Sequence, residues 1–252
     1  MCLIIFSFKE SEEKPLVVCA NRDEFYSRQT TSLDIWTDKP DIIAGRDLKA
    51  GGTWMGINKK TGKFAAITNY RDLKLVKENV KSRGDIVSNF LENGSLLSEF
   101  IETLKKEKDQ YNGYNLIFGN KDSLFYYSNI NDNLKEIEPG LHGVSNHFLD
   151  TPWPKLVKAK QIFKKNFYSN NLKNKCFNLL SDKEFFPEKD LPETGMGLEW
   201  EKLLSPIFIK SDIYGTRSSS FIAFHENGNI DISEKAYIEE GCVKTTEFEI
   251  CD

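Results

Sequence analysis

The order of the expected strands and helices places this chain in the α+β class, as antiparallel sheets covered by helices. Blocks of strands alternate with blocks of helices along the sequence, and strands close the chain. A doubly wound parallel sheet would instead alternate strands and helices one by one. Short turn sequences join neighbouring strands, as in hairpins, and no repeat or linker divides the chain. We therefore expect a single domain over residues 1–252.

The first two strands are expected at residues 2–8 and 15–20, joined by a charged turn. Both segments are apolar at successive positions, so both faces of each strand should be buried in a core. The second strand runs directly into the polar sequence Asn-Arg-Asp-Glu at 21–24. In an antiparallel pair the far end of the second strand lies beside the start of the first. The sequence therefore places this polar cluster near residue 2.

The middle of the chain predicts strands and then helices. Strands are expected at 42–44, 51–57 and 63–68, with a glycine-containing hairpin turn at 58–62. Helices are expected at 84–91 and at 95–108, where apolar residues recur at helical spacing and Ser95 provides an N-cap. Strands return at 114–119 and 124–128, and residues 140–145 form a short extended piece.

A second helical zone begins at Thr151-Pro-Trp-Pro154, because proline suits the first turn of a helix. Apolar residues then continue at helical spacing to 167, and another helix is expected at 174–182. Residues 183–206 are rich in Pro, Glu and Gly and predict an irregular cover. Three strands, at 218–224, 230–237 and 242–250, close the chain.

The composition argues against several classes of protein. The net charge is −4, whereas a general nucleic-acid binder would carry a basic face. No run of 18 apolar residues is present, so no membrane span is expected. The N-terminus lacks the basic region and long apolar stretch of a secretory signal. We expect a cytoplasmic protein, and the sequence indicates no particular oligomeric state.

The cysteines and histidines form no metal-binding or disulfide pattern. The five cysteines are odd in number, widely spaced and without a CxxC pair, which is typical of free thiols in a reducing compartment. They are Cys2, Cys19, Cys176, Cys242 and Cys251. The histidines, at 142, 147 and 225, belong to no HExxH motif and read as solvated loop residues, although His147 follows Asn146 and could lie near a site. We expect neither a metal nor a cofactor.

Cys2 is the first candidate for chemistry. A small residue at position 2 permits removal of the initiator methionine, after which Cys2 carries both a thiol and a free α-amine. The amine, with a reference pKa of about 7.7–8.0, is a base within reach of the nucleophile. A buried structural cysteine in the first strand is the alternative, because free cysteine packs like a small hydrophobic residue.

Arg22 and Asp23 are the next candidates. A guanidinium near Cys2 would favour the thiolate, and a carboxylate would hold the protonated α-amine in place. Adjacent strand residues point to opposite faces, so both can face Cys2 only with a bend or bulge. The alternative is a surface cluster of ion pairs among Arg22, Asp23 and Glu24, which would contribute little to stability.

Asn69, Asn146 and Arg217 complete the candidate set. Each asparagine ends an apolar strand, where its side-chain amide could donate to an oxyanion, although asparagine is also a common turn residue. Arg217 could supply a second positive charge, or it could be a surface residue before a strand. The sequence Gly-Gly-Thr-Trp at 51–54 lacks the GK[ST] of a phosphate-binding loop and instead indicates a tight turn packing Trp54.

Taken in order along the chain, eight short segments resemble the NRDE family, that of transport and Golgi organisation protein 2. They are Met-Cys at 1–2, ANRDEF at 20–25, GGTWMG at 51–56, TNYR at 68–71, YNGYN at 111–115, GVSN at 143–146, TPW at 151–153 and YGTR at 214–217. The match runs from residue 1 to about 250. The family in turn is similar to N-terminal nucleophile hydrolases of the choloylglycine hydrolase and penicillin V acylase type, which implies a four-layer αββα sandwich.

The resemblance also implies two functions. As an enzyme, the chain would be a cysteine amidohydrolase that cleaves a linear amide, with the catalytic roles falling on Cys2, Arg22, Asp23, Asn69, Asn146 and Arg217. In those hydrolases the arginine and aspartate are separated by a few residues, whereas here they are adjacent. The alternative is a non-catalytic carrier of haem or of a lipid or acyl ligand, with a part in intracellular trafficking and Golgi organisation.

Overall fold

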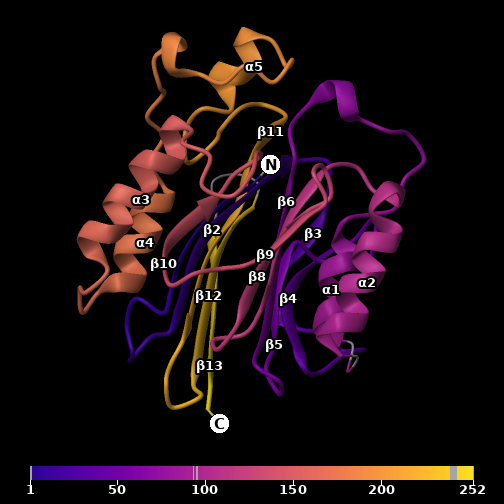
Figure 1. Ribbon diagram of the computed structural model, residues 1–252. Helices are drawn as coiled ribbons and strands as arrows, with labels where there is room; N and C mark the ends of the chain where they lie inside the picture. Colours follow the sequence, from indigo (N-terminus) through magenta and orange to yellow (C-terminus); the bar gives the residue numbers. More distant parts are fainter. Residues whose placement is uncertain (1, 93, 95, 239–242, 252) are drawn as a thin grey trace.

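Two antiparallel sheets lie face to face, with helices on both outer sides (Figure 1). The computed structural model describes residues 2–92, 94, 96–238 and 243–251. The expectations that concern Met1, Ser95 and Cys242 lie outside these residues. None of the helices in the described part of the chain has the length and apolar character needed to cross a membrane.

The first sheet has six strands in the order β10-β1-β2-β11-β12-β13. Their bounds are β1 Cys2–Phe8, β2 Leu16–Phe25, β10 Gly140–Val144, β11 Tyr214–Phe224, β12 Ile230–Tyr237 and β13 Val243–Ile250. The chain start and the C-terminal segment are thus neighbours, because β2 pairs with β11. This pairing brings the polar cluster at 21–24 against the strand that carries Arg217.

The second sheet has seven strands in the order β3-β4-β5-β6-β7-β8-β9. Their bounds are β3 Thr30–Ile35, β4 Ile42–Asp47, β5 Met55–Asn58, β6 Lys63–Asn69, β7 Tyr114–Gly119, β8 Leu124–Ser128 and β9 Asn133–Glu136. Every neighbouring pair in this sheet is antiparallel. The expectation of antiparallel sheets covered by helices is confirmed.

The helices form the two outer layers (Figure 1). Against the first sheet lie α3 Pro154–Asn166 and α4 Leu172–Leu180, and against the second lie α1 Gly84–Glu92 and α2 Leu97–Glu107. The segment 183–206, expected as an irregular cover, contains the short helix α5 Leu198–Leu203 and a 3-10 turn at Glu188–Asp190. Two further 3-10 turns lie at Leu73–Leu75 and Lys108–Gln110. Together the sheets and helices make four layers in the order αββα.

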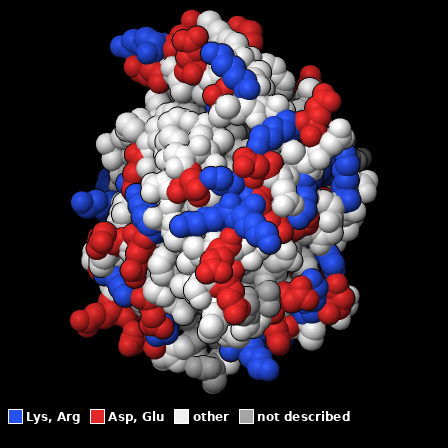
Figure 2. Space-filling view, turned by 45° about the vertical axis from the view of Figure 1, so that its right-hand side comes forward, with Lys and Arg blue, Asp and Glu red and all other residues white. Residues whose placement is uncertain are grey.

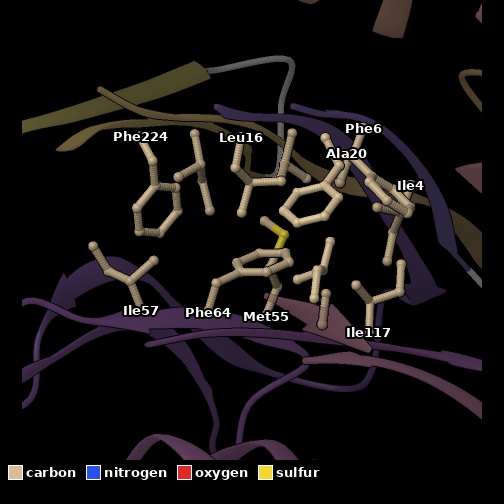
Figure 3. Packing of buried hydrophobic residues seen from close by; sticks show 14 of the residues in the cluster. Ile4, Phe6, Leu16, Ala20, Met55, Ile57, Phe64, Ile117 and Phe224 are labelled. Carbon is tan, nitrogen blue, oxygen red and sulfur yellow. The ribbon is translucent and has the colours of Figure 1, made fainter. Parts of the chain in front are cut away.

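The alternation of side chains along the buried strands builds the layers. Ile4 and Phe6 of β1 point between the sheets, where they meet residues such as Phe64 (Figure 3). Leu3 and Ile5 point the other way, under α3 and α4. Each fully buried apolar side chain contributes about 1.5–3 kcal/mol, so a strand buried on both faces anchors two layers at once.

The structure differs from the expected elements mainly at the sheet edges. β3 and β9 were not expected, because they are edge strands whose sequences are mostly polar and half-exposed. The strand expected at 51–57 begins at Met55, since Gly51 adopts φ +79° in a turn. β2 and β11 extend further than their apolar runs, through residues 21–25 and 214–217 respectively. These two polar extensions line up with each other beside the start of β1.

Candidate functional site

A cavity of about 410 Å³ opens at the end of the sandwich where β1 begins. Its walls come from both sheets and from the segment leading into α1. Five of the six residues expected to carry chemistry line this cavity, namely Cys2, Arg22, Asp23, Asn69 and Arg217. The structure thus brings together side chains that are up to 215 positions apart in the sequence.

Cys2 is the first residue of β1 and pairs directly with Arg22 of β2. Its side chain is 8% exposed, at the cavity wall. Burial raises the pKa of the Cys2 thiol, and the nearby Asp23 carboxylate raises it further. The Arg22 guanidinium and a hydrogen bond from the backbone of Asp23 act in the opposite direction. At rest the thiol therefore favours its neutral form and needs a base to become a nucleophile.

Arg22 is buried, with 7% of its surface exposed, and lies on the side of β2 that faces the second sheet. Within the described residues it forms no ion pair, and its Nη1 has no hydrogen-bond partner. The alternative of a surface ion-pair cluster is therefore wrong for Arg22. A buried polar group without a partner is rare in folded proteins and suggests a ligand or other missing partner.

Asp23 points to the opposite side of β2, into the layer of α3 and α4. Its Oδ1 accepts a hydrogen bond from Thr216 Oγ1 at 2.7 Å, and its carbonyl oxygen accepts one from the Tyr214 hydroxyl at 2.9 Å. Burial raises the pKa of the Asp23 carboxyl, while Lys155 and the Thr216 hydrogen bond oppose this rise. The adjacent Arg22 and Asp23 thus face different layers, as the strand geometry requires.

Lys155 is a buried cation near the site that the sequence reasoning missed. It lies in the first turn of α3, is 3% exposed, and its Nζ donates to the Leu204 carbonyl oxygen at 2.9 Å. Burial lowers the pKa of Lys155 to about 8, although the nearby carboxylate of Asp23 favours its charged form. The only sequence signal was its position directly after Thr151-Pro-Trp-Pro154.

Asn69 and Asn146 are hydrogen-bonded to each other, but only Asn69 lines the cavity. Asn69 ends β6 at the cavity wall. Asn146 is fully buried behind it and is not a lining residue; its Nδ2 donates to the Asn69 carbonyl oxygen at 3.0 Å. The Asn146 carbonyl oxygen in turn accepts from the Arg71 N–H at 2.7 Å. This arrangement makes Asn146 a support for the Asn69 backbone.

Arg217 lies at an irregularity in β11, where the pairing with β2 shifts register between Thr216 and Ser218. Backbone oxygens hold the guanidinium: its Nη1 donates to the carbonyl oxygen of Phe25 at 3.2 Å and to that of Tyr26 at 2.8 Å. It also lies over the Tyr26 ring, 5.4 Å from the centroid. The β-bulge therefore lets Arg217 turn towards the end of β2 and the cavity.

Two further charged residues of the cavity, Glu234 and Arg83, were missed. Glu234 of β12 is buried, and its Oε1 accepts from the Leu33 N–H at 2.7 Å, which joins the two sheets. Burial raises the pKa of the Glu234 carboxyl. Arg83 precedes α1 and donates from Nη1 to the Gly113 carbonyl oxygen at 3.0 Å. A single charged residue in a strand or before a helix carries no signal that separates it from a surface residue.

The cover segment is held down by a buried ion pair. Arg71 Nη2 lies 2.9 Å from Glu201 Oε2, with both side chains about 5% exposed. The Arg71 guanidinium also lies over the Trp153 ring, 4.6 Å from its centroid. Together with the Lys155 bond to Leu204, this pair fixes α5 against the sandwich end that holds the site.

The expectation of solvated loop histidines is wrong for His142, which lies in β10, whereas His147 and His225 lie in loops and are half-buried. His147 lies between Tyr70 and Thr151, 2.9 Å from a hydroxyl oxygen of each, and outside the cavity lining. His142 and His225 each lie against an aspartate carboxylate, at 2.7 and 2.9 Å. In the described residues no group of three His, Cys, Asp or Glu side chains could hold a metal ion. The described cysteines, Cys2, Cys19, Cys176 and Cys251, are free thiols.

Comparison with known proteins places the chain among relatives of similar length. It is 30% identical over 262 residues to the Transport and Golgi organization 2 homolog of Mus musculus, covering 95% of this chain and 94% of that protein. Identity, length and coverage are the same for the Homo sapiens homolog. The Drosophila melanogaster protein is 26% identical over 266 residues, covering 93% and 92% of the two chains.

Among solved structures, a Caenorhabditis elegans N-acylethanolamine-hydrolyzing acid amidase ortholog matches with a TM-score of 0.51. The match covers 88% of this chain and 92% of that chain at 10% sequence identity, so it concerns the fold alone. That fold is the N-terminal nucleophile hydrolase type. Residues 1–239 match the family described as Transport and Golgi organisation 2. Together with the curated relatives, this match shows that the chain belongs to the Transport and Golgi organisation 2 family, on an N-terminal nucleophile hydrolase-like fold.

Proposed function

We propose that this protein is a cysteine amidohydrolase that cleaves a linear amide bond, with Cys2 as its N-terminal nucleophile. The observation that carries the proposal is the position of Cys2 at the wall of a 410 Å³ cavity, directly paired with the buried Arg22. The proposal requires removal of Met1, so that the α-amine of Cys2 becomes free. A reducing, cytoplasmic location would keep the thiol available.

In the proposed reaction, the Cys2 sulfur attacks the amide carbonyl carbon and the α-amine takes the thiol proton. The C–N bond then breaks, the proton passes to the leaving amine, and an acyl thioester remains on Cys2. Water, activated by the same α-amine, hydrolyses the thioester and releases the carboxylic acid. Because burial raises the pKa of the Cys2 thiol, the reaction needs a base close to the sulfur, and in this scheme the α-amine is that base.

The surrounding residues receive roles from their positions. Arg22 would stabilise the developing thiolate, and Asp23, held by Thr216, would orient the protonated α-amine. Asn69 would donate to the oxyanion from the cavity wall, and Asn146 would position Asn69 through its backbone. Arg217 would add positive charge at the same wall.

A second candidate function is a non-catalytic carrier of haem or an acyl lipid, with a part in intracellular trafficking and Golgi organisation. A neighbouring cavity of about 250 Å³ favours it, because apolar side chains that are 43–62% exposed line it. These are Phe25, Leu73, Leu75 and Val76. The two cavities share Asn69, Arg83 and Asn112 as a common wall.

The test combines mass, turnover and binding. Intact mass spectrometry reports whether Met1 is present, and a panel of acyl amides is then assayed with wild type and Cys2→Ala. Cys251→Ala is the matched control, because it removes an exposed thiol outside the cavity. Haem and acyl-lipid binding are measured for the same three proteins.

The amidohydrolase proposal expects loss of Met1, turnover by wild type and Cys251→Ala, and no turnover by Cys2→Ala. It also expects a trapped thioester on Cys2 in the wild-type mass spectrum. Ligand binding unchanged in Cys2→Ala, with no turnover by wild type lacking Met1, would instead support the carrier.

A further inference from the structure

The Cys2 cavity is cationic although the chain is acidic. Seven arginine and lysine side chains line it, against four aspartates and glutamates, whereas the whole chain has a net charge of −4. Figure 2 shows a group of basic side chains near the centre of one face, bordered by acidic ones. A concave site with this charge distribution concentrates anions relative to bulk solvent.

Several of these cations are already neutralised by carboxylates. Arg28 Nε lies 2.6 Å from Asp47, and Arg46 donates to both oxygens of Asp38 at 2.6 and 2.9 Å. Lys81 is paired with Glu107 at 3.1 Å. These pairs leave their arginines and lysine with compensated charge, so they are not the strongest anion ligands of the cavity.

Arg22 and Arg83 differ from these cations. Within the described residues neither makes an ion pair, and Arg22 has a buried Nη1 without any hydrogen-bond partner. The Arg83 Nη1 donates to the Gly113 carbonyl oxygen, which carries no net charge. Burial lowers the pKa of the Arg83 guanidinium and the nearby Arg28 cation lowers it further, while Glu24 and Cys2 oppose this shift. Arg83 also belongs to the wall that the polar and the apolar cavities share.

A guanidinium binds carboxylate and phosphate oxygens in a planar, two-point geometry that compensates its charge. We propose that Arg83 binds an anionic group of the substrate, a carboxylate or a phosphate, where the polar and apolar cavities meet. The substrate is then an acyl amide whose amine portion carries the anion. This inference rests on the proposed amidohydrolase function, and its binding test below does not require turnover.

The experiment compares three amides that share one acyl chain. They are N-decanoylglycine, N-decanoyl-O-phosphoethanolamine and the neutral N-decanoylethanolamine. Turnover is measured for wild type, Arg83→Gln and Arg83→Lys, and equilibrium binding of the same compounds is measured in a Cys2→Ala background. Lys164→Gln, which removes an exposed lysine of α3 outside both cavities, is the matched control.

We expect wild type to favour one anionic amide over the neutral one by about 10- to 100-fold in kcat/KM, the worth of one charge-assisted hydrogen-bonded contact. The preference should fall in Arg83→Gln, mostly as a rise in KM, and recover in part in Arg83→Lys but remain in Lys164→Gln. The preferred anion distinguishes a carboxylate from a phosphate ligand.

Equal use of neutral and anionic amides, or an unchanged preference in Arg83→Gln, would overturn the inference. If no amide is turned over, the amidohydrolase proposal fails and binding alone decides. Binding that favours an anion and weakens in Arg83→Gln then supports the anion site, and binding without either property refutes it.

Discussion

Replacing Lys155 with methionine should remove a pH dependence of stability that is built into the helical layer beside Asp23. Lys155 is 3% exposed, donates to the Leu204 carbonyl oxygen, and has a pKa lowered to about 8. Below that pH its charge is retained in both the folded and the unfolded protein, so the cost of burying the charge is complete. Above it the folded protein releases the proton first, and the cost falls.

The magnitude follows from the two protonation states. An unfolded lysine titrates near about 10.4, so between about pH 8 and 10.4 the unfolded state binds more protons and stability rises with pH. From about pH 7 to about pH 9.5, this group adds about 2 kcal/mol to the free energy of unfolding. Burial raises the pKa values of the Cys2 and Cys19 thiols, so their contribution to the free energy of unfolding falls over the same pH range. They are present in both proteins, so their effect cancels in the comparison.

The assay is urea unfolding of wild type and Lys155→Met at both pH values. The stability of wild type relative to the variant should rise by about 2 kcal/mol from the lower to the higher pH. Lys164→Met, an exposed lysine on the same helix, is the control. Parallel pH profiles for wild type and Lys155→Met would show that Lys155 is not held as a buried cation.

Two further changes test how the site end is assembled. Arg71→Leu and Glu201→Leu should each lower the free energy of unfolding by about 3–5 kcal/mol, because each leaves a buried charge without its partner. The double variant should lose much less than the sum of the two single losses. Additive losses in this double-mutant cycle would contradict the ion pair. Gly52→Ala should cost about 1–3 kcal/mol, because a Cβ there would lie 2.6 Å from the backbone of the first residue of α1. Gly94→Ala, where a Cβ meets nothing within 4 Å, is its control, and equal losses would contradict the close approach.

The four layers could be predicted because the central strands are recognisable as continuous apolar runs in the sequence. The run at residues 2–8 is apolar at both alternating sets of positions, and β1 is buried along its whole length. Edge strands give no such signal: only Leu33 of β3 is buried, so its sequence looks like a loop. The sequence also did not predict that β2 extends through its polar residues, because their burial depends on pairing with β11, about 200 residues later.

The residues of the candidate site could be predicted only in part, for a related reason. Cys2 and Asn69 lie at strand ends, and Arg22 follows the apolar run of β2 and pairs with the start of β1. Lys155 and Arg83 belong to helix starts, where lysine and arginine usually face solvent. Their burial results from packing between segments that are remote in sequence, which no local pattern records.

Arg22 and Asp23 are adjacent on β2, so both cannot face the cavity from the same side of the strand. This adjacency explains how the candidate site is connected to the cover. Because the two side chains point to opposite faces of β2, their charges enter different layers. Arg22 reaches the cavity between the sheets, while Asp23 lies in the helical layer, where Thr216 holds it and Lys155 supplies the nearby positive charge. Lys155 is also bonded to Leu204, at the end of α5. The electrostatic environment of Asp23, and through Asp23 that of the Cys2 thiol, therefore depends on the packing of Lys155 against the cover.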